Sequence, residues 1–375
     1  MTKKKLTKRK KILVKKKVTK KDNKKKTRRI KHKKFNKNNK KGGGNIADGY
    51  FTIMSFNVEI YLNLYNYTIK DNKIVTCVTE DVDKIKKFKK LFTGIDIACL
   101  QEVDKPSNFP YPIFKNPLES DILPLVNLEQ KSICASETLD WSKATIMYGI
   151  PSYLANAIYV SSDIESMTSH ENKINSFGIE RCYSSISIVI NGKIIKIVSV
   201  HLIGGRFDDK EAIQKEGYNS EKLNQIRKVV NEENPDIICG DFNTKIRTKI
   251  VEDNTDNYFK KLLQDLNIPL EKQREYQKKW DDWIYIDDIH QFLIDNGYLS
   301  VYFNNDGMFE SSVIDTSAYG GIVDMIYYKK DKLLLEPNSV AVVGEGIVME
   351  KHPESNTYTP ILSDHYPVKA EFKII

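Results

Sequence analysis

Long apolar segments and regularly spaced cysteines are both missing from this 375-residue sequence. No apolar run approaches the roughly 18 residues that a membrane-spanning helix requires. The apolar run at residues 12–14 is far too short for the hydrophobic region of a secretory signal peptide. We therefore expect a protein that is not secreted and has no transmembrane segment.

The cysteines are few, odd in number and nowhere spaced as C-x-x-C. They are Cys77, Cys99, Cys134, Cys182 and Cys239. This usage argues against a structural zinc site and fits a reducing compartment. We expect an intracellular protein, nuclear or cytoplasmic, and no sequence feature indicates an obligate oligomer.

Acidic residues are almost absent from the N-terminal segment. Residues 1–41 hold 23 of the 59 Lys and Arg but only one of the 50 acidic residues, so they carry +22 and the remainder carries −13. A segment this charged and poor in apolar residues cannot bury enough surface to offset its ordering entropy. We expect a disordered basic tail over residues 1–44, ending in the flexible joint Gly42-Gly43-Gly44, and a folded domain over residues 45–375.

The basic tail suggests contact with polyanions. Nucleic acid is the favoured partner, and residues 27–34 resemble a nuclear localisation signal. An anionic membrane or lipid head group is a second partner that such a charge would bind. The alternative is a solvated arm that only aids solubility.

The folded domain is organised around residues 235–244, where a short apolar strand ends in polar residues. Residues 237–239 form the strand, Gly240 stops it, and Asp241 and Asn243 follow two residues apart. Side chains at that spacing on a strand end point the same way. The two therefore project together from a sheet edge as a carboxylate that can hold a water or metal and an amide that can hold a phosphate oxygen. An Asx-turn that merely closes the strand is the alternative.

Polar residues end other apolar segments in the same way. Strands are expected at residues 51–57, 95–100, 155–160, 181–190, 193–202, 320–328 and 368–375, and amphipathic helices at 80–92 and 220–232. The Asn191-Gly192 turn predicts a β-hairpin. At strand ends stand Asn57, Glu59, Glu102 and His201, while Asp324 interrupts an apolar run and Asp364-His365 precede the last strand.

Two regions are less regular. Residues 103–150 are rich in proline and predict a long surface excursion over the site. Residues 245–320 predict polar helices, in which Trp280 and Trp283 indicate a helix face packed on the core rather than a base-stacking platform.

The chain resembles the endonuclease/exonuclease/phosphatase superfamily, the deoxyribonuclease-I-like metal-dependent phosphoesterases, over residues 50–375. The resemblance rests on blocks that occur in the family's order, at residues 55–59, 100–102, 199–202, 240–243, 323–326 and 363–365. It implies a four-layer α/β sandwich, in which two mostly antiparallel β-sheets are flanked by helices. It places every polar residue of these blocks along one edge of the sandwich.

The resemblance also implies a role for each of these residues. Glu102 would bind Mg²⁺ or Mn²⁺ with Asn57, Glu59 and Asp364, because oxygen ligands suit these cations. Asp241 would position or deprotonate the attacking water, and Asn243 would bind the phosphate. His365, oriented by Asp324, would donate to the phosphate, and His201 would stabilise the transition state or protonate the leaving group. Arg181 is a further candidate for contact with the phosphate.

The substrate stays open at this stage. We expect metal-dependent hydrolysis of a phosphodiester in nucleic acid, because the basic tail would bring an acidic domain to a polyanion. The alternatives are an inositol-phosphate phosphatase or sphingomyelinase-like phospholipase, and a non-catalytic nucleic-acid-binding protein that keeps the fold.

Deletion of residues 1–44 tests the tail. We expect affinity for nucleic acid at low salt to fall by at least about tenfold, because the lysines release counterions when they neutralise phosphates. Fluorescence anisotropy with labelled DNA at two salt concentrations measures this loss, and anionic vesicles serve as the comparison. Equal affinities of the full and shortened chains for both ligands would show that the tail is only a solubilising arm.

Overall fold

The computed structural model describes part of the chain. The described residues are 46–66, 69–70, 73–74, 79–105, 117–119, 127–135, 153–176, 179–204, 218–247, 252, 259–304, 309, 311, 313, 315–318, 320–352 and 357–375. The basic tail and the boundary at residue 44 lie outside them and remain predictions. Among the described residues, no helix is both long and apolar enough to cross a membrane.

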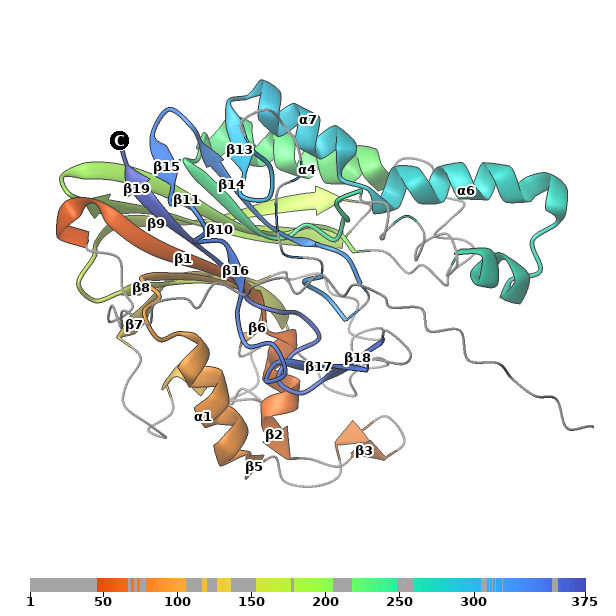
Figure 1. Cartoon of the computed structure of the whole chain (residues 1–375), viewed down its shortest axis with the longest axis horizontal. Coiled ribbons are helices and arrows are strands. Elements are labelled where there is room, and N and C mark those ends of the chain that lie inside the picture. The colour runs from red at the N-terminus through yellow and green to blue at the C-terminus, as the bar shows by residue number, and fades with distance from the viewer. Residues whose placement is uncertain are drawn as a thin grey trace, which may run out of the picture. The chain divides into compact units, whose positions relative to one another are not determined.

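Two β-sheets form the centre of the domain (Figure 1). The first has the strand order β15-β19-β1-β6-β8-β7, with β16 paired to β19. Its strands are β1 (Tyr50–Asn57), β6 (Ile97–Lys105), β7 (Leu128–Ala135), β8 (Tyr153–Ser161), β15 (Leu333–Leu335), β16 (Ala341–Val342) and β19 (Val368–Ile374). Of its pairs only β1 with β6 is parallel.

The second sheet has the order β13-β14-β12-β11-β10-β9. Its strands are β9 (Glu165–Ser176), β10 (Ile179–Ile190), β11 (Lys193–His201), β12 (Ile237–Asp241), β13 (Tyr298–Ser300) and β14 (Asp324–Lys329). Here only β11 and β12 run parallel. The predicted hairpin is confirmed, since Asn191 and Gly192 join β10 to β11 with φ of +52° and +73°.

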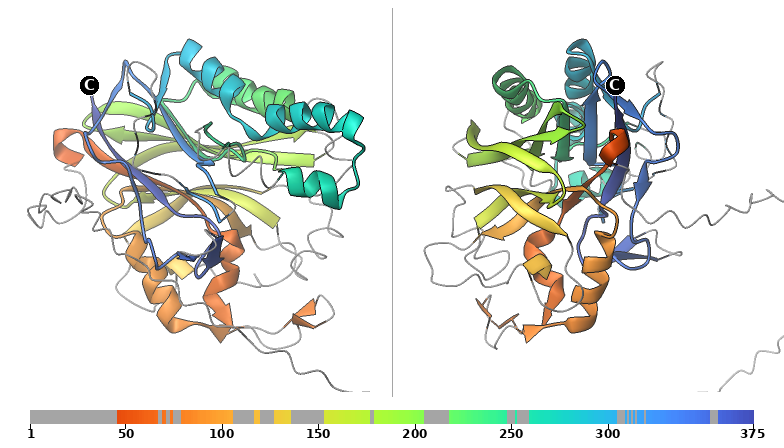
Figure 2. Two further views of the ribbon diagram at one scale, coloured as in Figure 1. Left: turned by 45° about the vertical axis from the view of Figure 1, so that its right-hand side comes forward. Right: turned by 90° about the vertical axis from the view of Figure 1, so that its left-hand side faces the viewer.

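Helices cover the outer faces and complete the predicted four layers (Figure 2). The α-helices are α1 (Val82–Leu91), α4 (Tyr218–Glu233), α6 (Leu270–Ile284) and α7 (Asp287–Asp295). The 3₁₀ turns are η1 (Ile46–Asp48), η2 (Glu59–Leu64) and η3 (Pro117–Glu119). Short two-stranded pieces are β2 (Tyr65–Asn66), β3 (Ile69–Lys70), β4 (Lys73–Ile74), β5 (Thr79–Glu80), β17 (Met349–His352) and β18 (Thr357–Pro360).

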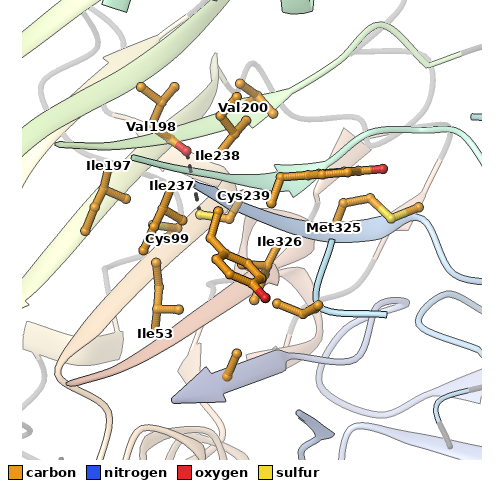
Figure 3. Packing of buried hydrophobic residues seen from close by; sticks show 14 of the residues in the cluster. Ile53, Cys99, Ile197, Val198, Val200, Ile237, Ile238, Cys239, Met325 and Ile326 are labelled. Atoms are coloured by element: carbon orange, nitrogen blue, oxygen red, sulfur yellow. Dashed lines mark hydrogen bonds between the residues drawn. The ribbon is translucent and has the colours of Figure 1, made fainter. Parts of the chain in front are cut away.

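The side chains of β1 alternate between the two faces of the first sheet and pack into a different hydrophobic core on each face. Phe51 and Ile53 pack into the main core between the sheets, together with residues of β11, β12 and β14 (Figure 3). Met54 and Phe56 face the other side and pack against Ile85 and other residues of α1. The period of two along a strand therefore explains why this sheet is buried on both faces.

The irregular regions contain more structure than the sequence predicts. The prediction of a surface excursion over residues 103–150 is wrong in part, because β6 continues to Lys105 and β7 forms the edge strand of the first sheet. In the second region, α6 packs on a separate small core that includes Phe259 and Trp280, whose rings lie 4.7 Å apart. Trp280 is buried there as expected, while the side chain of Trp283 lies outside the described residues. This helical segment is inserted directly after β12, and Lys245 pairs with Tyr285 at its base.

Gly240 shows how closely β12 approaches β11. Its φ is +144°, and a Cβ atom placed on it would lie 1.8 Å from the main-chain oxygen of Val200. Any side chain here would force apart the two strands that carry His201 and Asp241.

We expect Gly240→Ala to lower the free energy of unfolding by about 3 kcal/mol or more, because the strands must separate to admit the methyl group. Gly192→Ala is the matched control. Its φ is also positive but no atom lies within 4 Å of the added Cβ, so it should cost only about 1 kcal/mol. Urea denaturation measures the free energy of unfolding of both variants. Equal losses of stability in the two would contradict the close approach of β12 to β11 as the cause.

Candidate active site

The register of the second sheet brings three of the predicted residues side by side. His201 ends β11 opposite Asp241, which ends β12, and Asp241 lies opposite Asp324, which begins β14. Asp324 is thus the first residue of its strand, not an acid inside an apolar run as the sequence predicts. The main-chain N–H of Asp324 donates to Thr316 Oγ1 at 3.1 Å, outside the strand ladder.

The first sheet contributes two residues to the same edge. Asn57 ends β1 and Glu102 lies on the neighbouring parallel strand β6. The Asn57 side-chain nitrogen Nδ2 lies 3.2 Å from Glu102 Oε1 and 3.2 Å from Asp241 Oδ2. One amide therefore connects a carboxylate of each sheet.

Three site residues have left-handed backbones, which non-glycine residues rarely adopt: Glu59 with φ of +45°, Glu102 and Asn243. Glu102, with φ of +54°, occupies a β-bulge where β6 has one extra residue against β8. Asn243, with φ of +50°, donates its main-chain N–H to Asp241 Oδ1 at 2.8 Å. Asn243 Nδ2 lies 3.1 Å from the Leu202 carbonyl and 3.4 Å from Asp241 Oδ2. Bulges and left-handed residues of this kind concentrate at functional sites.

The segment before β19 adds a histidine. Ser363 donates its hydroxyl to the Asn57 carbonyl at 2.7 Å and accepts the His365 main-chain N–H at 3.1 Å. His365 Nδ1 lies 2.9 Å from Asp324 Oδ2, and its Nε2 lies 3.8 Å from Asp241 Oδ2. Asp324 thus orients the ring so that Nε2 is directed towards Asp241.

Four carboxylates near this edge carry raised pKa values, among them Asp324, whose pKa burial raises to about 6 although His365 lowers it. Burial, reinforced by the charge of Asp364, raises the pKa of Glu102 to about 7. Burial together with Asp364 and Glu102 raises the pKa of Glu59 to about 8. Burial also raises the pKa of Asp364. Buried carboxylates that repel one another are stabilised by a divalent cation.

The carboxylate oxygens suit Mg²⁺ or Mn²⁺. The Asn57 amide faces Glu102 with Nδ2 and accepts the Glu59 main-chain N–H with Oδ1 at 3.0 Å, so it must turn over before its oxygen can join them. The group whose mutual distances would let it share an ion is a different one, since ligand atoms of Asp241, Asp324 and His365 lie within 4.8 Å of one another. His365 is occupied by Asp324 in that group, and a protonated imidazole cannot ligate a metal. The carboxylate group is therefore the better candidate.

The two histidines of the site differ in charge. Burial opposes protonation of His365, but the carboxylates of Asp324, Asp241 and Asp364 outweigh burial and hold its pKa well above the ordinary value. Burial and then the nearby Arg181 lower the pKa of His201 to about 3. At neutral pH, His365 is therefore an imidazolium and His201 is neutral.

Arg181 contacts His201 from the side away from the carboxylates. Its guanidinium nitrogen Nη1 lies 3.5 Å from His201 Nδ1. His201 Nε2 in turn lies 3.6 Å from both Glu102 Oε1 and Asp241 Oδ2. If Nδ1 accepts from Arg181, Nε2 carries the hydrogen and faces the two carboxylates.

The structure brings the predicted residues into one connected site. They are Asn57, Glu59, Glu102, Arg181, His201, Asp241, Asn243, Asp324, Asp364 and His365. The sequence analysis missed Lys222, which is fully buried in α4 and donates from Nζ to the Asn243 carbonyl at 2.7 Å. Helical spacing could have found it, because Lys222 lies four residues before Ile226 on the apolar face.

Comparison with known proteins supports the fold. No protein-family model matches the sequence, and no curated protein matches it either. The crystal structure of an endonuclease/exonuclease/phosphatase from Beutenbergia cavernae matches with a TM-score of 0.50 and 10% identity, over 87% of this chain and 72% of that chain.

Two further solved structures were found at lower TM-scores. The human Nocturnin catalytic domain with bound sulfate gives 0.49 at 13% identity, over 87% of this chain and 94% of that chain. D. rerio TDP2 complexed with single-strand DNA product gives 0.44 at 14% identity, over 87% of this chain and all 100% of that chain.

We expect Asp324→Asn to lower the pKa of His365. Asp324 is the strongest of the carboxylates that favour the imidazolium, so its loss leaves burial to favour the neutral ring. In the wild type, the His365 Cε1–H NMR signal should stay in the protonated position through neutral pH. In the variant, the same signal should shift to the position of the neutral ring at a lower pH than in the wild type. A His365 signal that titrates identically in both proteins would contradict the pairing.

Proposed function

Because the chain has the fold of the endonuclease/exonuclease/phosphatase superfamily, we propose that it is a divalent-metal-dependent phosphodiesterase that acts on nucleic acid. The observation that carries the proposal is the position of the Asp241 carboxylate. It lies between the imidazolium of His365 and the amide that connects it to Glu102. A carboxylate in that place can orient a water molecule towards a phosphate held by its neighbours.

The metal group is proposed to consist of Glu102, Asp364, Glu59 and Asn57. When bound, Mg²⁺ or Mn²⁺ supplies positive charge that stabilises the phosphoryl oxygens and the leaving oxygen. The raised pKa values of Glu102 and Glu59 support this assignment, because they reflect burial first and then repulsion by neighbouring carboxylates, and a bound cation would offset both.

The chain's own residues supply the remaining chemistry. Asp241 accepts the proton of the attacking water, while His365 donates its Nε2–H to a phosphoryl oxygen and keeps its charge through Asp324. Asn243 binds a phosphate oxygen when its 3.4 Å contact with Asp241 Oδ2 is replaced. His201 stabilises the transition state as a neutral donor, and the low pKa beside Arg181 argues against its protonating the leaving group.

Nucleic acid is the proposed substrate because of the charge distribution. The domain outside the tail carries −13 and would repel a polyanion, while residues 1–41 carry +22. The tail would therefore tether the nucleic acid to the domain and raise its local concentration.

A substrate panel tests the proposal. It contains plasmid, single-stranded DNA, RNA, 5′-phosphotyrosyl DNA, an inositol polyphosphate and sphingomyelin, each incubated with Mg²⁺ and wild-type or Asp241→Asn protein. Cleavage of one nucleic acid that is lost in Asp241→Asn supports the proposal. Cleavage of the inositol or lipid substrate alone would replace it with the small-phosphate or phospholipase function. No cleavage with retained binding of nucleic acid would indicate a non-catalytic binding protein.

Glu102→Gln is expected to abolish metal activation. The change keeps the shape of the side chain but removes its charge, so turnover should fall about a hundredfold or more. The rise in melting temperature that Mg²⁺ causes in the wild type should also disappear. Glu129→Gln, at an exposed position on the edge strand β7, is the matched control and should behave as wild type. An unchanged Mg²⁺ response in Glu102→Gln would refute the assigned ligand.

A further inference from the structure

Lys222 is a lysine without solvent exposure, an unusual state for this residue type. Helix α4 places it on the face that packs against the second sheet, in the same row as the buried Ile226 and Val229. Its Nζ donates to the Asn243 main-chain oxygen at 2.7 Å. The negative charge of Asp241 also favours its protonated form against the effect of burial.

The Lys222 bond completes a set that fixes Asn243 from several directions. The Asn243 N–H is held by Asp241 Oδ1, and its side-chain Nδ2 contacts the Leu202 carbonyl. Lys222 holds the remaining main-chain group, the carbonyl oxygen. The residue held in this way has the left-handed φ of +50°, which persists only where surrounding contacts impose it.

A second polar residue of α4 acts on the adjoining segment. Gln225 is three residues further along the helix and almost fully buried. Its Oε1 accepts the main-chain N–H of Ile203 at 3.1 Å. The helix therefore ties down the chain after His201 through Gln225 and the chain after Asp241 through Lys222.

We propose that Lys222 is a positioning residue of the site, which holds the Asn243 turn so that the Asn243 amide and the Asp241 carboxylate keep their orientation. The inference rests on the proposed phosphodiesterase function. Lys222 acts on the turn through a main-chain oxygen. A residue of helix α4 thereby controls geometry at the sheet edge.

The test compares Lys222→Met, which keeps the length but loses the donor, with Lys222→Arg, which keeps a charged donor. Ile226→Val is the matched control, because it removes one methylene from the same buried face one turn away. Two readouts are used: hydrogen exchange of the Asn243 amide in the intact protein, and kcat and KM on the substrate that the panel identifies.

In Lys222→Met we expect faster exchange at Asn243 and a fall in kcat of about 10- to 100-fold, because misplacement by about 1 Å has this cost. KM should change much less, and Lys222→Arg should recover part of kcat. Ile226→Val should lower the melting temperature by a few degrees at ~1 kcal/mol of lost stability and leave both readouts at wild-type values.

Folded Lys222→Met with wild-type kcat, or with unchanged exchange at Asn243, would overturn the inference. If Lys222→Met does not fold, Lys222→Leu takes its place, since it too lacks a donor, and unchanged kcat again overturns the inference. If the wild type cleaves nothing in the panel, the proposed function fails, while exchange at Asn243 still decides whether Lys222 holds the turn.

Discussion

The Asp241 carboxylate is the group through which the two sheets and the C-terminal segment meet. It accepts from Asn57 of the first sheet, from the Asn243 turn of its own strand, and faces the rings of His201 and His365. Its residue is 1% exposed, so these protein groups, and not bulk water, stabilise its charge. A buried carboxylate is tolerated only when such donors surround it, and the convergence of strand ends supplies them.

The layered fold and the gathering of the candidate residues at one edge could be predicted from the sequence because both depend on where strands end. Apolar runs that end in Asp241, His201 or Asn57 mark strand ends, and the Asn191-Gly192 turn fixes the hairpin between β10 and β11. Strand ends that share a direction meet at one edge of a sheet. The strand order of a known fold therefore places these polar residues together at that edge.

Other features depend on contacts that no local pattern records. Asp324 begins its strand instead of lying within it, because its N–H bonds to Thr316 in an earlier segment. Strand β7 forms by pairing with β8. It lies in a proline-rich stretch whose composition indicates a loop and not a strand. Helical spacing places Lys222 on the buried face of α4, but its bond to the Asn243 carbonyl and the nearby charge of Asp241 depend on how α4 packs on the sheet.

The helical insertion after β12 is closed at its base by main-chain hydrogen bonds. The Lys245 N–H donates to the Ile284 carbonyl and the Ile286 N–H to the Lys245 carbonyl, so the two ends of the insertion meet beside the strand. Its own small core stabilises the segment between them. Lengthening a loop whose ends are already joined adds little closure entropy. The segment can therefore be lengthened or shortened with little effect on the position of β12 and Asp241.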